Sequence, residues 1–139
     1  MVFFRKRFSA ILAAGLAVAF HRTDAPEAAA SVSLVQLIAA PRAWNGKPVR
    51  VIGFLRLEFE GDALYQHEED FIHKISANAV SVDLAKEFPE RAKLGMNYVL
   101  IEGIFTASDS RDAAAFAGKI NQIRRAEIWS ARTVINPDD

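Results

Sequence analysis

The stretch from Pro48 to Tyr65, PVRVIGFLRLEFEGDALY, decides the fold class, because its apolar residues recur at every second position. A period of two places successive side chains on opposite faces of an extended chain. We therefore expect a long β-strand over residues 48–59. Gly53 in its middle indicates a sharp bend or a bulge, which is typical of a sheet that curls into a barrel.

Further strands follow this one. Gly61-Asp62 has the form of a two-residue hairpin turn with glycine first, which predicts a short second strand over residues 63–66. Three more alternating runs predict strands at residues 79–84, 97–106 and 116–128. The last run changes phase between Ile120 and Ile123, which predicts a bulge. Five strands interrupted by glycines predict a mainly β fold, a five-stranded OB-like barrel.

A short helix is expected before the barrel. Ser33 and Gln36 have the spacing of a capping box, in which each side chain binds the backbone N–H of the other. Pro41 ends the helix, because the residue before a proline avoids the helical region. The helix carries one apolar stripe, formed by Leu34, Leu37 and Ile38. We expect this stripe to cover Ile52 and Phe54, the apolar residues on the second face of the first strand.

Five segments carry a resemblance to known proteins: SLVQLIAAPRAWNGKPVRVIGFL, LEFEGDALY, NAVSVDL, YVLIEGIF and FAGKINQI. Together they resemble a group of small exported bacterial domains with an OB-like fold and no assigned activity. The resemblance covers nearly all of the chain after its N-terminal segment, and it brings no functional residues. Common OB folds place a helix between strands three and four. Here residues 85–95 contain Pro89, which predicts a loop or a single helical turn instead.

The N-terminal segment has the three parts of a secretory signal peptide. Basic residues 5–7 precede an apolar run over residues 8–20, and small-residue patterns follow at 17–19 and 28–30. This run is shorter than the roughly 20 residues that span a bilayer. We expect residues 1–30 to be signal peptide and linker, 31–135 the barrel domain and 136–139 a disordered tail. The protein is then periplasmic or secreted, and it meets the membrane only during export.

Charge and cysteine content limit the possible functions. The chain has 17 basic and 17 acidic residues. Four of the basic and two of the acidic residues lie in residues 1–30, so 13 basic and 15 acidic residues remain in the rest of the chain. This balance gives no general attraction for a polyanion. The chain has no cysteine, so its hydrophobic core must stabilise the fold without disulfides.

The segment HEEDFIH, residues 67–73, is similar to the zinc-protease pattern H-E-x-x-H but does not match it. That pattern needs a second histidine four positions after His67, where Phe71 stands. We expect a short surface helix without a metal, stabilised by a Glu69–His73 pair. Its apolar residues Phe71, Ile72 and Ile75 are expected to pack inward.

Sequence signatures of catalysis are also absent. The chain has no thiol nucleophile, no G-x-S-x-G elbow and no glycine-rich phosphate loop. We therefore expect no enzymatic activity and no cofactor.

A binding surface is expected where OB-like barrels leave strands two and three uncovered, beside the loop between strands four and five. It maps to Tyr65, Ser81, Asp83, Asp109 and Arg111. Its mixed charge favours a protein edge or a small neutral ligand over nucleic acid, since single-strand binders combine a basic groove with several exposed aromatic rings.

These features predict an exported, non-catalytic binding or interaction module of the cell envelope. The alternatives are a membrane-tethered accessory subunit with an uncleaved N-terminal anchor and, less favoured, a single-stranded nucleic-acid binder.

Overall fold

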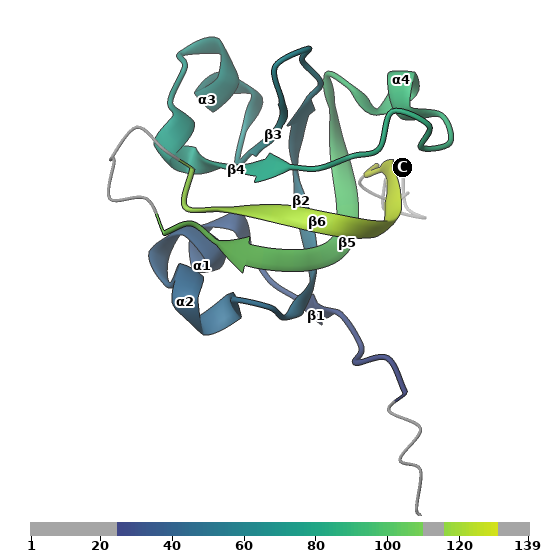
Figure 1. The fold of residues 1–139 in the computed structure, drawn as a ribbon. Coiled ribbons are helices and arrows are strands. Elements are labelled where there is room, and N and C mark those ends of the chain that lie inside the picture. Colours follow the sequence, from purple (N-terminus) through teal and green to yellow (C-terminus); the bar gives the residue numbers. More distant parts are fainter. Residues whose placement is uncertain (1–24, 110–115, 131–139) are drawn as a thin grey trace, which may run out of the picture.

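The computed structural model describes residues 25–109 and 116–130, which form a mainly β barrel with a few short helices (Figure 1). The strands of this part of the chain are β1 (Ala30–Ser31), β2 (Pro48–Arg56), β3 (Asp62–Tyr65), β4 (Ala79–Val82), β5 (Asn97–Ala107) and β6 (Gly118–Ile128). The helices are α1 (Leu34–Ala39), α2 (Pro41–Trp44), α3 (Glu68–Ile72) and α4 (Arg91–Leu94), with a 3₁₀ turn η1 at Ser76–Asn78. The predicted signal peptide lies mostly, and the predicted tail entirely, outside the described residues.

The barrel closes in the order β2-β3-β4-β6-β5, with β5 pairing back onto β2. All of these pairs are antiparallel except β4–β6, which is parallel. The predicted fold class, a five-stranded OB-like barrel preceded by a short helix, is confirmed. The two-residue strand β1 was not predicted; it pairs with β2 in parallel and is too short to show a period. Since β1 begins at Ala30, the expected domain boundary after residue 30 divides this strand.

The core fills the inside of the barrel, and every strand from β2 to β6 contributes its inward face. Its most deeply buried side chains are Leu37, Val49, Val51, Leu55, Leu64, Val80, Val99, Ile101, Phe105 and Ile120. Burial of a side chain of this size contributes about 1.5–3 kcal/mol relative to exposure. The helices α1 and α2 lie at one end of the barrel and α4 near the other (Figure 1). Leu94 of α4 is also buried in this core.

The helix α1 has the predicted capping box. The Ser33 Oγ accepts a hydrogen bond from the Gln36 N–H at 3.2 Å, and the Gln36 Oε1 accepts one from the Ser33 N–H at 2.9 Å. Pro41 ends α1 as predicted, but it also begins α2, which was not predicted. Proline suits the first position of a helix because the N–H that it lacks would have no partner there.

The predicted position of α1 was wrong. Leu34 lies against the inner face of β2, where its Cδ1 is 2.9 Å from the position that a Cβ on Gly53 would occupy. The missing side chain of Gly53 leaves the space into which Leu34 packs. Phe54, on the outer face, is covered by Phe71 and Tyr98 instead, with ring centroids 6.1 and 5.6 Å away. Ile52 stays 40% exposed.

The connection between the first two barrel strands was also predicted wrongly. β2 ends at Arg56 and β3 begins at Asp62, so a five-residue loop replaces the two-residue turn. The Asp62 carboxylate closes this loop by accepting a hydrogen bond from the Glu58 N–H at 3.1 Å. Phe59, predicted to lie in the strand, is therefore 99% exposed in the loop.

The predictions for the later part of the barrel are mostly confirmed. Residues 85–95 contain one helical turn, α4. The phase change in β6 is a bulge, because the pairing with β5 shifts register between Glu102 and Ile104. Gln122 adopts a positive φ of 48° within this bulge.

The HEEDFIH segment contains the predicted surface helix, α3, but its inward face was predicted wrongly. Ile72 and Ile75 are exposed, and Phe71 is only half-buried. The buried residue is Asp70, whose carboxylate accepts hydrogen bonds from the His67 N–H at 3.0 Å and the Asn78 Nδ2 at 2.8 Å. This carboxylate ties the start of α3 to η1, and the two isoleucines face solvent as a result.

Candidate functional site

Tyr65, Ser81 and Asp83 share the outer face of neighbouring strands. Ser81 lies opposite Ala63 in the β3–β4 pair, and Tyr65 lies opposite Ala79. Asp83 follows β4 by the same alternation and is exposed. Asp109 is exposed beyond the end of β5, whereas Arg111 lies outside the described residues. Ser81 and Asp83 line two different pockets, and Tyr65 packs against Phe71 of α3.

Ser81 lines a cavity of about 320 Å³ where β4 runs beside β6. Its other lining residues come from the ends of β5 and β6 and the chain next to them: Thr106, Ala107, Ser108, Phe116, Gly118 and Lys119. Lys119 lies opposite Ser81 in the parallel β4–β6 pair and opposite Thr106 in the antiparallel β5–β6 pair. Three polar side chains from three strands therefore stand in one row at the cavity.

The polar groups of this cavity suit a ligand that offers hydrogen-bond acceptors. The Thr106 Oγ1 accepts a hydrogen bond from the Asn121 Nδ2 at 3.0 Å, which leaves the hydroxyl proton of Thr106 available as a donor. Within the described residues, no carboxylate lies within 4 Å of the Lys119 ammonium group. Phe116 adds a half-buried apolar wall. Small-ligand sites commonly combine an apolar lining with a few polar groups in this way.

Tyr65 belongs to an aromatic cluster between α3 and the barrel. Its ring meets the Phe71 ring edge-on, with centroids 5.6 Å apart. The Arg56 guanidinium lies over the Phe71 ring, 5.2 Å from its centroid. Burial raises the pKa of Tyr65, and the negative charge of Glu58 raises it further, against a smaller opposite effect of Arg56. The side chain of Tyr65 thus helps to hold α3 on the barrel.

Asp83 lines a second groove, whose lining also includes an ion pair between Asp62 and Arg91. The Arg91 Nη2 is 2.7 Å from Asp62 Oδ2 and 2.9 Å from Oδ1. Lys86 and Glu58 also line this groove, so its charge is mixed. The backbone N–H of Asp83 donates to the Ile120 carbonyl at 2.9 Å, which extends the β4–β6 pairing by one residue.

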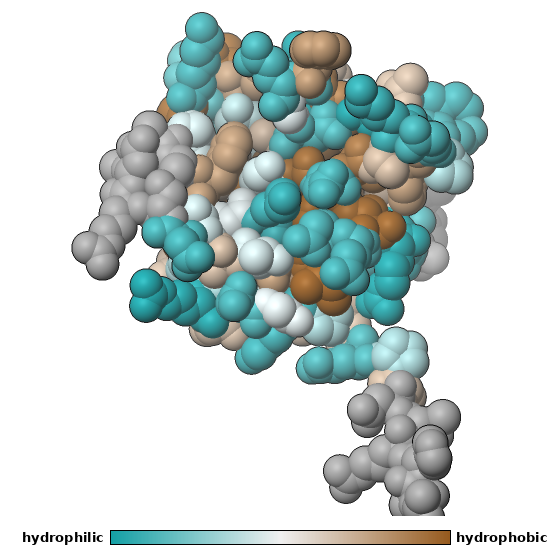
Figure 2. Space-filling model, viewed as in Figure 1, coloured by the Kyte–Doolittle hydropathy of each residue, from teal (hydrophilic) through white to brown (hydrophobic). Residues whose placement is uncertain are grey.

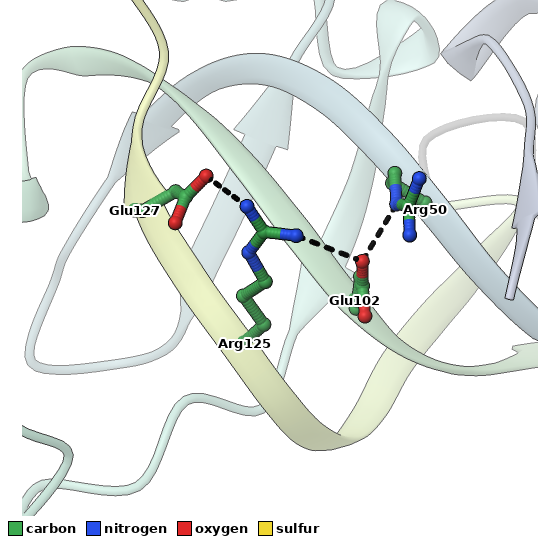
Figure 3. Close-up of polar contacts among 4 residues, drawn as sticks. All are labelled: Arg50, Glu102, Arg125 and Glu127. Atoms are coloured by element: carbon green, nitrogen blue, oxygen red, sulfur yellow. Dashed lines mark hydrogen bonds and ion pairs between the residues drawn. The ribbon is translucent and has the colours of Figure 1, made fainter.

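A row of charges crosses the outer faces of β2, β5 and β6 (Figure 3). The Glu102 Oε1 lies 2.6 Å from the Arg50 Nε and 3.4 Å from the Arg125 Nη1, and the Arg125 Nη2 lies 2.5 Å from the Glu127 Oε1. The hydrogen bond from Arg125 lowers the pKa of Glu127. Figure 2 shows hydrophilic side chains alternating with apolar surface on the face where β5 and β6 lie in front.

The sequence did not predict this row of charges, nor that Lys119 lies beside Ser81 at the cavity. Arg50 and Glu102 are 52 residues apart, and no local pattern links them. One signal was available: Glu102 is the only charged residue in an otherwise apolar strand, so it had to face outward beside a partner.

The two described histidines lie at the ends of α3. The His67 Nδ1 is 3.4 Å from Asp70 Oδ2, and the His73 Nε2 is 3.6 Å from Glu69 Oε2, which is the predicted pair. Residues 25–109 and 116–130 contain no group of three or more His, Asp or Glu side chains arranged to hold a metal ion. None of the helices in these ranges is both long and apolar enough to span a membrane.

Comparisons with known proteins add information on the fold. No protein-family model matches the sequence, and no curated protein matches it. The structure is similar to the crystal structure of a DUF3299 family protein from Pseudomonas aeruginosa PAO1, with a TM-score of 0.54 and 15% sequence identity. The similarity covers 76% of this chain and 99% of that chain. At this identity the likeness shows the shared fold alone.

Proposed function

We propose that this protein is an exported, non-catalytic binding module of the cell envelope, and that it takes a small polar ligand in the cavity between β4, β5 and β6. One observation carries the proposal: the register of three strands lines up Ser81, Lys119 and Thr106 at that cavity. The Lys119 ammonium and the two hydroxyls can all donate hydrogen bonds. The ligand therefore carries a carbonyl, hydroxyl or carboxylate oxygen and is small enough to fit beside Phe116.

The surroundings of the cavity support binding without catalysis. A nucleophilic Ser81 or Lys119 would need a base or an orienting partner within hydrogen-bond reach. The two histidines of the described residues lie at the ends of α3, each beside a carboxylate, and neither lines the cavity. The nucleic-acid alternative gains little support, because Arg50 and Arg125 already pair with carboxylates instead of forming a basic groove.

The proposal of export rests on the N-terminal sequence. Intact-mass measurement of the protein from periplasmic and membrane extracts distinguishes a free periplasmic protein from one that stays tethered to the membrane. A loss of the residues up to Ala19 or Ala30 supports a free periplasmic module. Full-length protein that stays with the membrane would favour the tethered accessory subunit instead.

The ligand proposal can be tested with a defined panel of neutral sugars, amino acids and short carboxylates. Binding at the cavity should raise the melting temperature of the protein, because a ligand that binds the folded state stabilises it. Calorimetry should then show at least tenfold weaker binding for Lys119→Met. Lys86→Met is the matched control, because Lys86 lines the other groove, and it should leave the affinity unchanged. Equal affinity in both variants would refute this site.

A further inference from the structure

A second surface of the barrel exposes apolar side chains far from the cavity. Ile52, Met96, Tyr98 and Trp129, here called the platform, are between 38% and 48% exposed. They come from β2, from the start of β5 and the residue before it, and from the residue after β6. The cavity residues Thr106 and Lys119 lie at the other end of the β5–β6 pair.

The pairing of the strands makes the platform continuous. Tyr98 lies opposite Phe54, and Ile52 lies opposite Leu100, two residues further along the same pair of strands. The Trp129 N–H donates to the Tyr98 carbonyl at 2.8 Å and so extends the sheet by one residue. Because paired residues share a face of a sheet, Ile52 and Tyr98 are diagonal neighbours on the outside of the barrel.

The platform is held in place by contacts beneath and beside it. The Tyr98 ring meets Phe54 at 69° with centroids 5.6 Å apart, and its hydroxyl accepts a hydrogen bond from the Glu68 N–H at 3.2 Å. The Met96 N–H donates to the Leu55 carbonyl at 2.8 Å, and its sulfur lies 3.7 Å from the Arg56 Nη1. A surface already fixed in one conformation loses little side-chain entropy when a partner binds.

The charges beside the platform are balanced. Arg50 and Arg125 face Glu102 and Glu127 in one connected row, two cations with two anions. Two copies of such a surface can meet across a two-fold axis without an excess of like charge. The combination of an apolar centre rich in aromatic residues and methionine with a polar rim is also typical of protein interfaces.

We propose that the platform binds a second copy of this chain in a symmetric dimer. Because the platform consists of only four partly exposed side chains, we expect a weak, reversible association, with a Kd of about 1–100 µM. This association is separate from ligand binding in the cavity, since the two sites share no residue.

Sedimentation velocity of the full-length chain over a range from about 1 to 500 µM tests the dimer. The wild type should shift from monomer to dimer, and Trp129→Ser and Ile52→Ser should each raise the Kd at least tenfold. Phe59→Ser is the matched control, because it removes a fully exposed ring outside the platform, and it should leave the Kd unchanged. Any association through the N-terminal segment would be the same in all of these proteins.

Disulfide cross-linking gives a second, independent readout because the chain has no cysteine. Met96→Cys should form a covalent dimer under mild oxidation faster than Phe59→Cys. A wild-type chain that stays monomeric at 500 µM would overturn the proposal. So would a dimer that both serine variants of the platform leave intact, or equal cross-linking rates at residues 96 and 59.

Discussion

Arg91 binds both carboxylate oxygens of Asp62 through one nitrogen, at 2.7 and 2.9 Å, and so joins α4 to the first residue of β3. Asp62 is only 6% exposed, and the same carboxylate accepts the Glu58 N–H. One buried side chain therefore ties the β2–β3 loop, the strand β3 and the connection between β4 and β5 together.

Replacing Asp62 with Asn should destabilise the protein by about 2–3 kcal/mol, because it removes the negative charge that balances the partly buried Arg91 and one of the two oxygens that Arg91 binds. Urea unfolding followed by circular dichroism measures this change. Glu90→Gln, which breaks the exposed Glu90–Lys93 pair, should leave the unfolding midpoint unchanged. A midpoint for Asp62→Asn equal to that of the control would contradict this role of Asp62.

Within the HEEDFIH segment, Asp70 should contribute to the stability of the fold, whereas the side chains of His67 and His73 should contribute little. Asp70→Ala removes the acceptor for the His67 N–H and the Asn78 amide, which should cost about 1–3 kcal/mol. His67→Ala and His73→Ala should each change the free energy of unfolding by less than about 0.5 kcal/mol. Stoichiometric zinc that survives purification and disappears in the double histidine variant would show that this segment binds metal after all.

Gly53 should not tolerate a side chain. A Cβ at this position would lie 2.7 Å from the Leu64 Cγ and 2.7 Å from the Tyr65 carbonyl oxygen, and the carbonyl is fixed by the sheet. Gly53→Ala should therefore destabilise the protein by about 2–3 kcal/mol. Gly46→Asn is the comparison, because Gly46 has open space around it and a φ of 76°, which asparagine tolerates. Thermal unfolding should show a clear loss for Gly53→Ala and a small change for Gly46→Asn; similar losses would refute the steric argument.

Tyr65 should titrate above pH 10, the ordinary value for tyrosine, because burial and the charge of Glu58 both disfavour its anion. The chain has two tyrosines, so a Tyr98→Phe variant reports Tyr65 alone by ultraviolet absorbance. A raised pKa in the folded state means that this group contributes stability below about pH 10 and loses it as the pH rises through the folded value. In the Tyr98→Phe background, Glu58→Gln should lower the pH midpoint of the Tyr65 titration, whereas Glu60→Gln should leave it unchanged. A midpoint at or below 10 would show that the ring is freely solvated.

The local pattern of the sequence was enough to predict the β class, the five barrel strands, the capped helix α1 and the bulge in β6. These features depend on near neighbours: a period of two decides which side of a strand faces the core, and Ser33 and Gln36 are three positions apart. The N-terminal segment likewise predicts export from its own residues, and that remains a prediction.

The tertiary structure alone decided which surfaces the barrel offers. Only the parallel β4–β6 pairing places Lys119 beside Ser81, and only the β2–β5 pairing places Ile52 beside Tyr98. The same long-range packing put Leu34 inside the barrel, turned Asp70 inward and left Ile72 outside, against the local pattern. The physical reason is that periodicity determines the face of a side chain but not its neighbour on the next strand. That neighbour depends on how the closed barrel fills its core, which residues far apart in the sequence determine together.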